Sequence, residues 1–205
     1  TVTGSLIKRV EYDSVSPVQV ITADTNVALG QVETSEFLQK SSIAAGATQI
    51  SHQFGAFVTE GGVGAQTLSL RGLGPNRSLV LLNGHRPGPA GTRGQVGAFD
   101  LNVLPSSIVQ RIELLKDGSY SIYGSDAVAG VANVITRKNI TSPEISVSFR
   151  APFYGGGEVV NFSGATGWNF DNGSITLAGE YYKQSPLKVG DRDFLKCSED
   201  LVWDQ

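Results

Sequence analysis

The sequence has no methionine, a single cysteine and no long apolar run. Because the chain starts at Thr1 and lacks methionine, we expect that a segment was removed upstream, for example a signal peptide. Cys197 has no partner cysteine in this sequence, so it is either a free thiol or half of a disulfide completed elsewhere. No stretch approaches the ~20 apolar residues of a membrane-spanning helix. Any role in a membrane must therefore use β-strands.

Concentrated charge and enzyme signatures are lacking as well. The 16 Lys and Arg residues lie singly among 19 Asp and Glu residues, which excludes nucleic acid and anionic lipid headgroups as favoured partners. The sequence has no nucleophile elbow, phosphate-binding loop or dinucleotide fingerprint. His52 and His85 have no second ligand at metal-binding spacing. We therefore predict no enzymatic activity, no cofactor and no metal site.

Residues before about position 140 mix strand-like and helix-like segments, and 40% of the chain is hydrophobic, which is enough for a core. Strands are predicted at 16–22, 66–71, 78–82, 111–115 and 130–136. Short helical segments are predicted at 34–41, 105–110 and around 120–123. Phe37 and Leu38 share one face of the first helix. A small α+β domain is expected.

Residues after about position 140 alternate between apolar and polar in three segments, 144–153, 159–170 and 174–182. Their lengths are close to the ~9–11 residues of a tilted membrane-spanning strand. The pattern fits a soluble sandwich as well as a membrane barrel. Aromatic residues near the strand ends favour the barrel, where they would form an interfacial girdle. They are Phe153, Trp168, Phe170, Tyr181 and Tyr182.

Two motifs resemble the plug domain of TonB-dependent receptors. The longer one runs from Pro105 to Lys138 and contains Arg-Ile-Glu-Leu-Leu-Lys-Asp-Gly at 111–118 and Tyr-Gly-Ser-Asp-Ala-Val-Ala-Gly-Val-Ala-Asn-Val-Ile-Thr at 123–136. The shorter one is Leu-Arg-Gly at 70–72 followed by Leu-Val-Leu-Leu-Asn-Gly-His-Arg at 79–86. The family often has aspartate at the position of Asn83 and arginine at that of Lys116.

The resemblance implies an α+β plug domain followed by the first antiparallel strands of a transmembrane β-barrel. Plugged transporters of this kind have about 22 strands, so three strands would be only the start. We expect three parts: an N-terminal segment at 1–15, the plug at 16–139, and at 140–205 three barrel strands with the start of an extracellular loop. The turn at 171–173 is short, as periplasmic turns are.

The N-terminus resembles the end of the Ton box, the segment that TonB grips. We expect Thr1, Val2 and Thr3 to contact the TonB C-terminal domain by strand addition, which main-chain hydrogen bonds drive and extended β-branched residues favour. The alternative is an ordinary frayed terminus.

Two further groups of residues receive roles by resemblance. Arg71 and Lys116 would pair with barrel carboxylates, and Glu113 is a third charged candidate for a contact between plug and barrel; the alternative is solvated charge. The loops 53–66 and 87–99 would face outward, and loops on a rigid scaffold often bind ligands. Ligand-contacting candidates there are Phe54, Phe57, Arg93 and Gln95.

The function implied by the resemblance is TonB-dependent import of a scarce solute across the outer membrane of a Gram-negative bacterium. Siderophore-iron, cobalamin and carbohydrate are the solute classes expected, with outer-membrane lipid around the strands. The alternative is a free-standing plug-like binding or signalling module that never enters a membrane. Outward apolar residues on the three strands distinguish the two, because such a module gains nothing from them.

Overall fold

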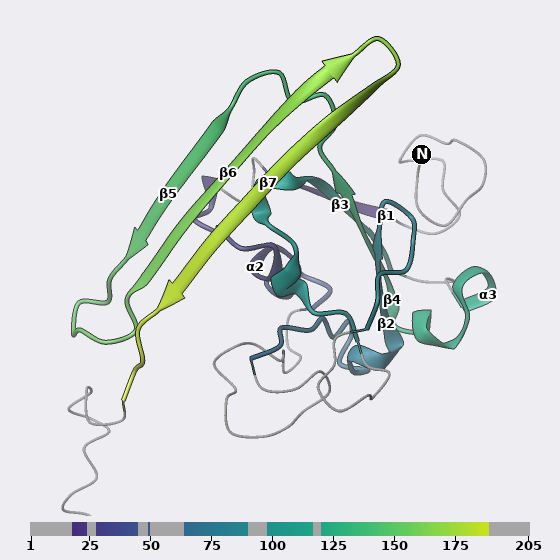
Figure 1. The fold of residues 1–205 in the computed structure, drawn as a ribbon. Helices are drawn as coiled ribbons and strands as arrows, with labels where there is room; N and C mark the ends of the chain where they lie inside the picture. Colours follow the sequence, from purple (N-terminus) through teal and green to yellow (C-terminus); the bar gives the residue numbers. More distant parts are fainter. Residues whose placement is uncertain are drawn as a thin grey trace, which may run out of the picture.

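The computed structural model describes residues 18–23, 28–44, 49, 64–89, 98–116 and 120–188. Two sheets organise them, as Figure 1 shows: a four-stranded sheet within a mixed domain, and beside it a sheet of three strands, two of them long. We call them the inner sheet and the outer sheet. None of the helices in the described ranges is long and apolar enough to cross a membrane.

The inner sheet contains β1 (Val18–Thr22), β2 (Ser78–Leu82), β3 (Val109–Leu115) and β4 (Gly130–Thr136), in the order β1-β3-β4-β2. The β3 strand pairs antiparallel with β1 and β4, and β2 pairs parallel with β4. Because successive side chains of a strand point to opposite faces, Val80 of β2 packs in one buried cluster, and Leu79 and Leu81 pack in another. The inner sheet therefore has a core on each face.

Short helices connect these strands. They are α2 (Thr34–Gln39), η2 (Pro75–Arg77), η3 (Leu101–Val103), η4 (Ser106–Ile108), α3 (Tyr120–Tyr123) and η5 (Ser125–Ala127). Phe37 and Leu38 of α2, which the sequence placed on one helical face, are fully buried in the larger core. The helical segment expected at 105–110 is shorter, a single 3-10 turn, because the chain becomes extended again at Val109.

The strand expected at 66–71 is not formed, and this prediction was wrong. The segment is buried up to Leu70, and its backbone finds partners outside any ladder. The N–H groups of Gln66, Ser69 and Leu70 donate to side-chain oxygens of Asp100, Gln49 and Ser78 at 3.0, 2.9 and 2.8 Å. Polar side chains thus satisfy the buried backbone in place of a neighbouring strand.

Gly130 shows why glycine is required at the start of β4. Its φ is 135°, outside the range that other residues readily adopt. A Cβ atom there would lie 2.7 Å from the backbone oxygen of Leu115 and 3.0 Å from Cδ1 of Leu70. The close approach of β3 to β4 therefore depends on the missing side chain.

The outer sheet contains β5 (Glu144–Arg150), β6 (Val159–Phe170) and β7 (Gly173–Gln184), paired antiparallel in sequence order. The predicted segments are confirmed, although β5 ends three residues early and β7 is longer. Large apolar side chains are exposed on one face of all three strands, up to 73% for Ile145. They are Ile145, Val147, Phe149, Val160, Phe162, Trp168, Phe170, Ile175, Leu177 and Tyr181.

The opposite face of the outer sheet is polar and turned toward the mixed domain. Asn161 and Ser163 on this face are buried, at 2% and 4% exposure. The two sheets are joined by residues 137–143. The domain boundary expected at 139 stays a prediction.

Candidate functional site

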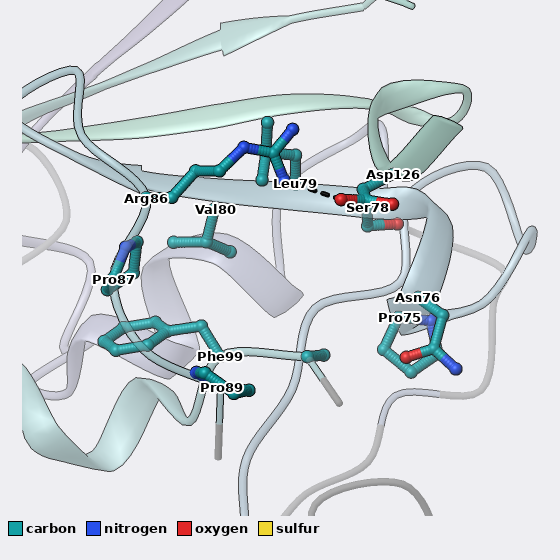
Figure 2. Close-up of a pocket in the computed structure, with 11 residues that line it drawn as sticks. Pro75, Asn76, Ser78, Leu79, Val80, Arg86, Pro87, Pro89, Phe99 and Asp126 are labelled. Atoms are coloured by element: carbon teal, nitrogen blue, oxygen red, sulfur yellow. Dashed lines mark hydrogen bonds and ion pairs between the residues drawn. The ribbon is translucent and has the colours of Figure 1, made fainter. Parts of the chain in front are cut away.

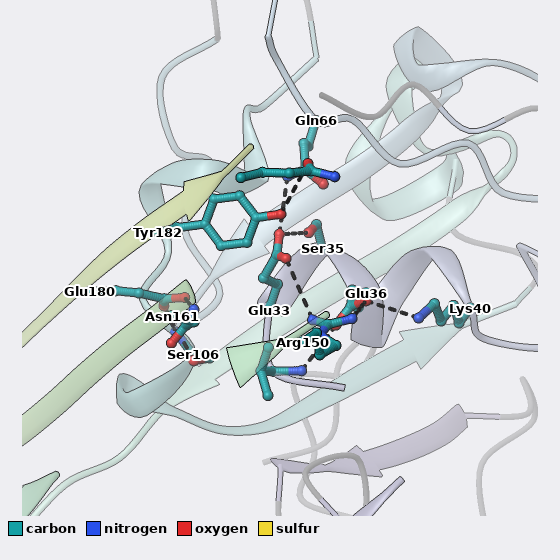
Figure 3. A network of polar contacts seen from close by, with 12 residues as sticks. Glu33, Ser35, Glu36, Lys40, Gln66, Ser106, Arg150, Asn161, Glu180 and Tyr182 are labelled. Atoms are coloured by element: carbon teal, nitrogen blue, oxygen red, sulfur yellow. Dashed lines mark hydrogen bonds and ion pairs between the residues drawn. The ribbon is translucent and has the colours of Figure 1, made fainter. Parts of the chain in front are cut away.

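Helix α2 is attached to the outer sheet by a two-pronged ion pair (Figure 3). Arg150, the last residue of β5, donates from Nη1 to Glu36 Oε1 at 3.0 Å and from Nη2 to Glu36 Oε2 at 3.1 Å. Lys40 Nζ, one helical turn later, donates to the same carboxylate at 2.9 Å, and so does the backbone N–H of Val32 at 3.0 Å. Such a fork fixes the orientation of both side chains.

This arrangement also sets the charge state of Glu36. Burial is the largest influence on its pKa and raises it, but hydrogen bonds from Arg150, Lys40 and the Val32 N–H outweigh burial. Together with attraction to Arg150 they lower the pKa of Glu36 from 4.5 to about 2. Glu36 is therefore ionised throughout the ordinary pH range.

A second carboxylate, Glu33, extends the network toward β7. Its Oε1 lies 3.9 Å from Arg150 Nη2, and its Oε2 accepts from Gln66 Nε2 at 3.3 Å. The side chain of Tyr182 on β7 is also hydrogen-bonded to Glu33 (Figure 3). Two strands of the outer sheet thus converge on the start of α2.

A separate group of contacts joins η4 to the outer sheet. The backbone N–H of Ser106 donates to Glu180 Oε2 on β7 at 2.7 Å, and its hydroxyl reaches the same oxygen at 3.2 Å. Asn161 on β6 donates to the other oxygen of Glu180. The hydroxyl of Ser107 donates to the backbone oxygen of Gly164 at 3.1 Å. The half-buried carboxylate of Glu180 therefore has hydrogen-bond partners on both sides of the interface.

A cavity of about 410 Å³ lies beside the contacts of η4 with the outer sheet. Its polar lining comes from both sides: Ser106, Ser107 and Gln110 from the mixed domain, and Ser146, Asn161 and Ser163 from the outer sheet. Arg137 and Glu144 also line it and form an ion pair at 2.5 Å. The interface is therefore a polar seam and not a closed apolar contact.

A second cavity, of about 330 Å³, lies along β2 (Figure 2). Pro75, Pro87, Pro89 and Phe99 contribute to its lining. Arg86 crosses it, as Figure 2 shows, and pairs with Asp126 at 2.6 Å.

Comparison with known proteins assigns the mixed domain. Residues 10–131, more than half of the chain, match the family model described as TonB-dependent Receptor Plug Domain. The chain belongs to this family. The plug is followed by the antiparallel strands of the outer sheet, as the sequence analysis expected.

Solved receptors share this fold. The ferric citrate transporter FecA in its unliganded form is similar with a TM-score of 0.61 at 21% identity, over 83% of this chain and 26% of its own. A G324V mutant of the ferric enterobactin receptor PfeA of Pseudomonas aeruginosa gives 0.60 at 23% identity, over 85% and 25%. The siderophore receptor PirA of Pseudomonas aeruginosa gives 0.57 at 21% identity, over 85% and 30%.

These similarities cover only part of each receptor: the chain spans 26%, 25% and 30% of the three matched proteins. The proteins are named as receptors and transporters and not as enzymes, in agreement with the expectation from sequence. At this level of identity, the comparison shows the fold.

Two of the three charged residues expected to join plug and barrel, Arg71 and Glu113, have partners within the plug. Arg71 donates to the backbone oxygens of Val128 at 2.8 Å and Ala129 at 3.1 Å. Glu113 is buried and pairs with Arg111 at 2.9 Å. Lys116 is half-buried just after β3. Their contact with barrel strands beyond β7 stays a prediction.

Other predicted residues fall outside the described part of the chain and stay predictions. These are the TonB-contacting Thr1, Val2 and Thr3, the ligand-contacting Phe54, Phe57, Arg93 and Gln95, and Cys197.

Sequence reasoning missed the residues that join the plug to the outer sheet. Arg150 and Glu180 belong to the polar positions of two alternating segments, and the sequence analysis gave them no role. A signal was present: a charged residue on the face opposite the apolar side chains must find a partner inside. The partners Glu36 and Ser106 carry no comparable signal, because their proximity depends on the tertiary fold.

Proposed function

We propose that the chain is the gated front part of an outer-membrane receptor that imports a scarce solute with energy delivered through TonB. The plug closes the interior of a barrel of which β5, β6 and β7 are the first strands. The observation that carries this proposal is the reversed polarity of the outer sheet. Its polar face is bonded to the plug, and its apolar face is exposed.

Reversed polarity suits a lipid environment and not water. Ten large apolar side chains on one continuous face would form an interaction site or a source of aggregation on a soluble protein. In a membrane, the same apolar face would contact the hydrocarbon tails of the lipids, as the outer face of a barrel does. This disfavours the free-standing plug-like module.

The connections of the outer sheet support an orientation. Two residues, Asp171 and Asn172, join β6 to β7, whereas residues 151–158 join β5 to β6. Short turns face the periplasm in barrels of this class, and longer loops face outward. On this basis Arg150 lies toward the outside and Glu144 toward the periplasm.

The plug would gate transport through its polar contacts with the strands. Glu36, Ser106 and Ser107 hold it in place by bonds that can be exchanged for water, so a pull on the N-terminus can rearrange it without breaking an apolar core. TonB would supply that pull through strand addition at Thr1, Val2 and Thr3. The solute is of the siderophore-iron, cobalamin or carbohydrate class; the receptors of similar fold include those named for siderophores and ferric citrate.

The test is uptake by cells that produce the full-length protein. Labelled ferric siderophores, cobalamin and oligosaccharides are offered to cells with and without functional TonB, and the protein is located by membrane fractionation. We expect the protein in the outer-membrane fraction and uptake of one solute class only when TonB is functional. Recovery of the full-length protein in the soluble periplasmic fraction would contradict the proposal.

A further inference from the structure

The cavity beside η4 contains two buried polar groups with unused hydrogen-bonding capacity. Both belong to β6, where Asn161 and Ser163 lie two residues apart on the face turned toward the plug and line the cavity. Asn161 uses its amide N–H for Glu180 (Figure 3), and within the described part of the chain its Oδ1 and the Ser163 hydroxyl have no hydrogen-bond partner. Because a buried polar group without a partner is unfavourable, these two groups favour a polar molecule in the cavity.

Further polar groups line the same cavity from β5 and from the plug. Ser146 of β5 lies opposite Ser163 in the ladder, and its hydroxyl also has no partner among the described residues. On the plug side, Gln110 accepts from Arg111 through Oε1 at 3.1 Å, which leaves its amide N–H groups available. The cavity therefore presents hydrogen-bond donors and acceptors together, from the plug and from the outer sheet.

The charge and size of the cavity restrict the kind of molecule that fits. Among the described residues that line it, the charged ones are Arg137 and Glu144, and they neutralise each other in a two-pronged ion pair. An anionic ferric complex therefore gains no attraction there. The volume of about 410 Å³ is at the low end of the ~300–1,000 Å³ of small-molecule sites. A short stretch of a neutral, hydroxyl-rich oligosaccharide suits this size and lining.

We propose that this cavity is a binding subsite for a neutral carbohydrate that passes between the plug and the outer sheet. Ser163 and Asn161 contact the sugar hydroxyls from the outer sheet, and Gln110 contacts them from the plug. A sugar hydroxyl both donates and accepts, so it can replace water at these mixed groups. In the orientation proposed above, Glu144 places the subsite toward the periplasm. This inference rests on the proposed function and narrows the solute to the carbohydrate class.

The test is the uptake of radiolabelled malto-, cello- and xylo-oligosaccharides by cells that produce the full-length receptor and functional TonB. Ser163→Ala removes one hydrogen bond to the sugar and should lower the maximal uptake rate about twofold to tenfold. Binding of the same sugar to cells without TonB should not change, because the variant leaves the outward loops unaltered. A fall in rate without a loss of surface binding places the effect inside the receptor.

A matched control separates this contact from the loss of a buried hydroxyl as such. Ser148 on β5 lies opposite Asn161, and its hydroxyl is also buried without a partner in the described structure, but Ser148 does not line the cavity. Ser148→Ala should therefore leave uptake unchanged. Ser163→Leu fills the cavity with a larger side chain and should nearly abolish carbohydrate uptake. Equal effects of the two alanine variants, or normal uptake in Ser163→Leu, would overturn the proposal.

Failure of this inference is distinguishable from failure of import itself. TonB-dependent uptake of a ferric siderophore or cobalamin, without uptake of these carbohydrates, would overturn the subsite and leave import intact. Absence of all TonB-dependent uptake would count against import, and crystals of the full-length receptor soaked with maltose, cellobiose or xylobiose would then decide the inference. Electron density for a sugar between Gln110 and Ser163 supports the subsite, and density for water alone contradicts it.

Discussion

The inner and outer sheets differ in which faces they bury: the inner sheet buries both faces, and the outer sheet buries its polar face and exposes its apolar one. In β2 and β4, the side chains on both faces pack into apolar cores, and Val131, Ala132 and Val134 are fully buried. In β5 and β7, the apolar side chains are the exposed ones and the polar ones face the plug. Because period-two alternation states only that two faces differ, the surroundings decide which face is inside.

The comparison also shows how each sheet is held. Apolar packing and a close backbone approach at Gly130 hold the inner sheet together. The outer sheet is joined to the plug by Arg150, Glu180 and their partners, which form directional bonds. This division is expected for a domain that must stay folded while it moves relative to the strands around it.

The largest expected effect comes from matched isoleucine substitutions in the two sheets. Ile112→Ala removes a fully buried side chain and should lower the free energy of plug unfolding by about 2–5 kcal/mol. Ile145→Ala, on the exposed face, should leave plug stability unchanged because its side chain points away from the plug. Hydrogen exchange of plug amides in the full-length receptor measures both. Equal losses of protection would contradict the contrast between the sheets.

A matched pair of glycines sharpens the comparison. Gly130→Ala places a Cβ atom 2.7 Å from Leu115 O in a strained backbone conformation, and should destabilise the plug by about 2–4 kcal/mol. Gly179→Ala in β7 meets nothing within 4 Å and should change stability by less than about 0.5 kcal/mol. Thermal unfolding of the two variants measures the difference. A tolerated alanine at position 130 would show that β3 and β4 can separate.

Most of the fold was predictable from sequence, and the misses have physical causes. The strands at 78–82, 130–136 and 159–170 carry strong local patterns and form where expected. The segment 66–71 has an equally good alternation but no strand, because Asp100, Gln49 and Ser78 replace the neighbour that a ladder needs. The local sequence pattern does not show which side chains from distant parts of the chain will pack beside this segment.

The candidate site was less predictable than the fold. The contact of Glu36 with Arg150 joins residues 114 positions apart. Neither residue belongs to the motifs that carry the family resemblance. Arg71 and Lys116 were chosen because they do belong to them, and Arg71 bonds the plug's own backbone in the described structure.

Acid should weaken the attachment between α2 and the outer sheet before it affects the apolar cores. Because the pKa of Glu36 is lowered from 4.5 to about 2, its ionisation stabilises the attachment above pH 4.5. This stabilisation, about 1–3 kcal/mol after allowance for solvent at Arg150, is lost as the pH falls from 4.5 toward 2. Hydrogen exchange of α2 at several pH values measures the loss. Glu36→Gln should lack this pH dependence, and an identical profile in that variant would contradict the assignment.

The smallest effect is expected for the exposed ion pair at the cavity along β2. Arg86 and Asp126 are about half exposed, so solvent screens their attraction. Asp126→Asn should lower plug stability by less than about 1 kcal/mol. Denaturant unfolding of the full-length protein gives the value, and a larger loss would show that this pair supports the plug more than its exposure indicates.

The accessibility of two neighbouring positions on β5 tests most directly whether the outer sheet faces lipid with its apolar side. Spin labels are attached at Val147→Cys and Ser146→Cys in the full-length receptor in lipid, with Cys197 replaced by serine. We predict that the label at 147 is accessible to apolar oxygen and shielded from a polar nickel reagent, and that the label at 146 is not oxygen-accessible. Equal oxygen accessibility at both positions, or the reverse order, would contradict the assignment of this sheet to a membrane wall.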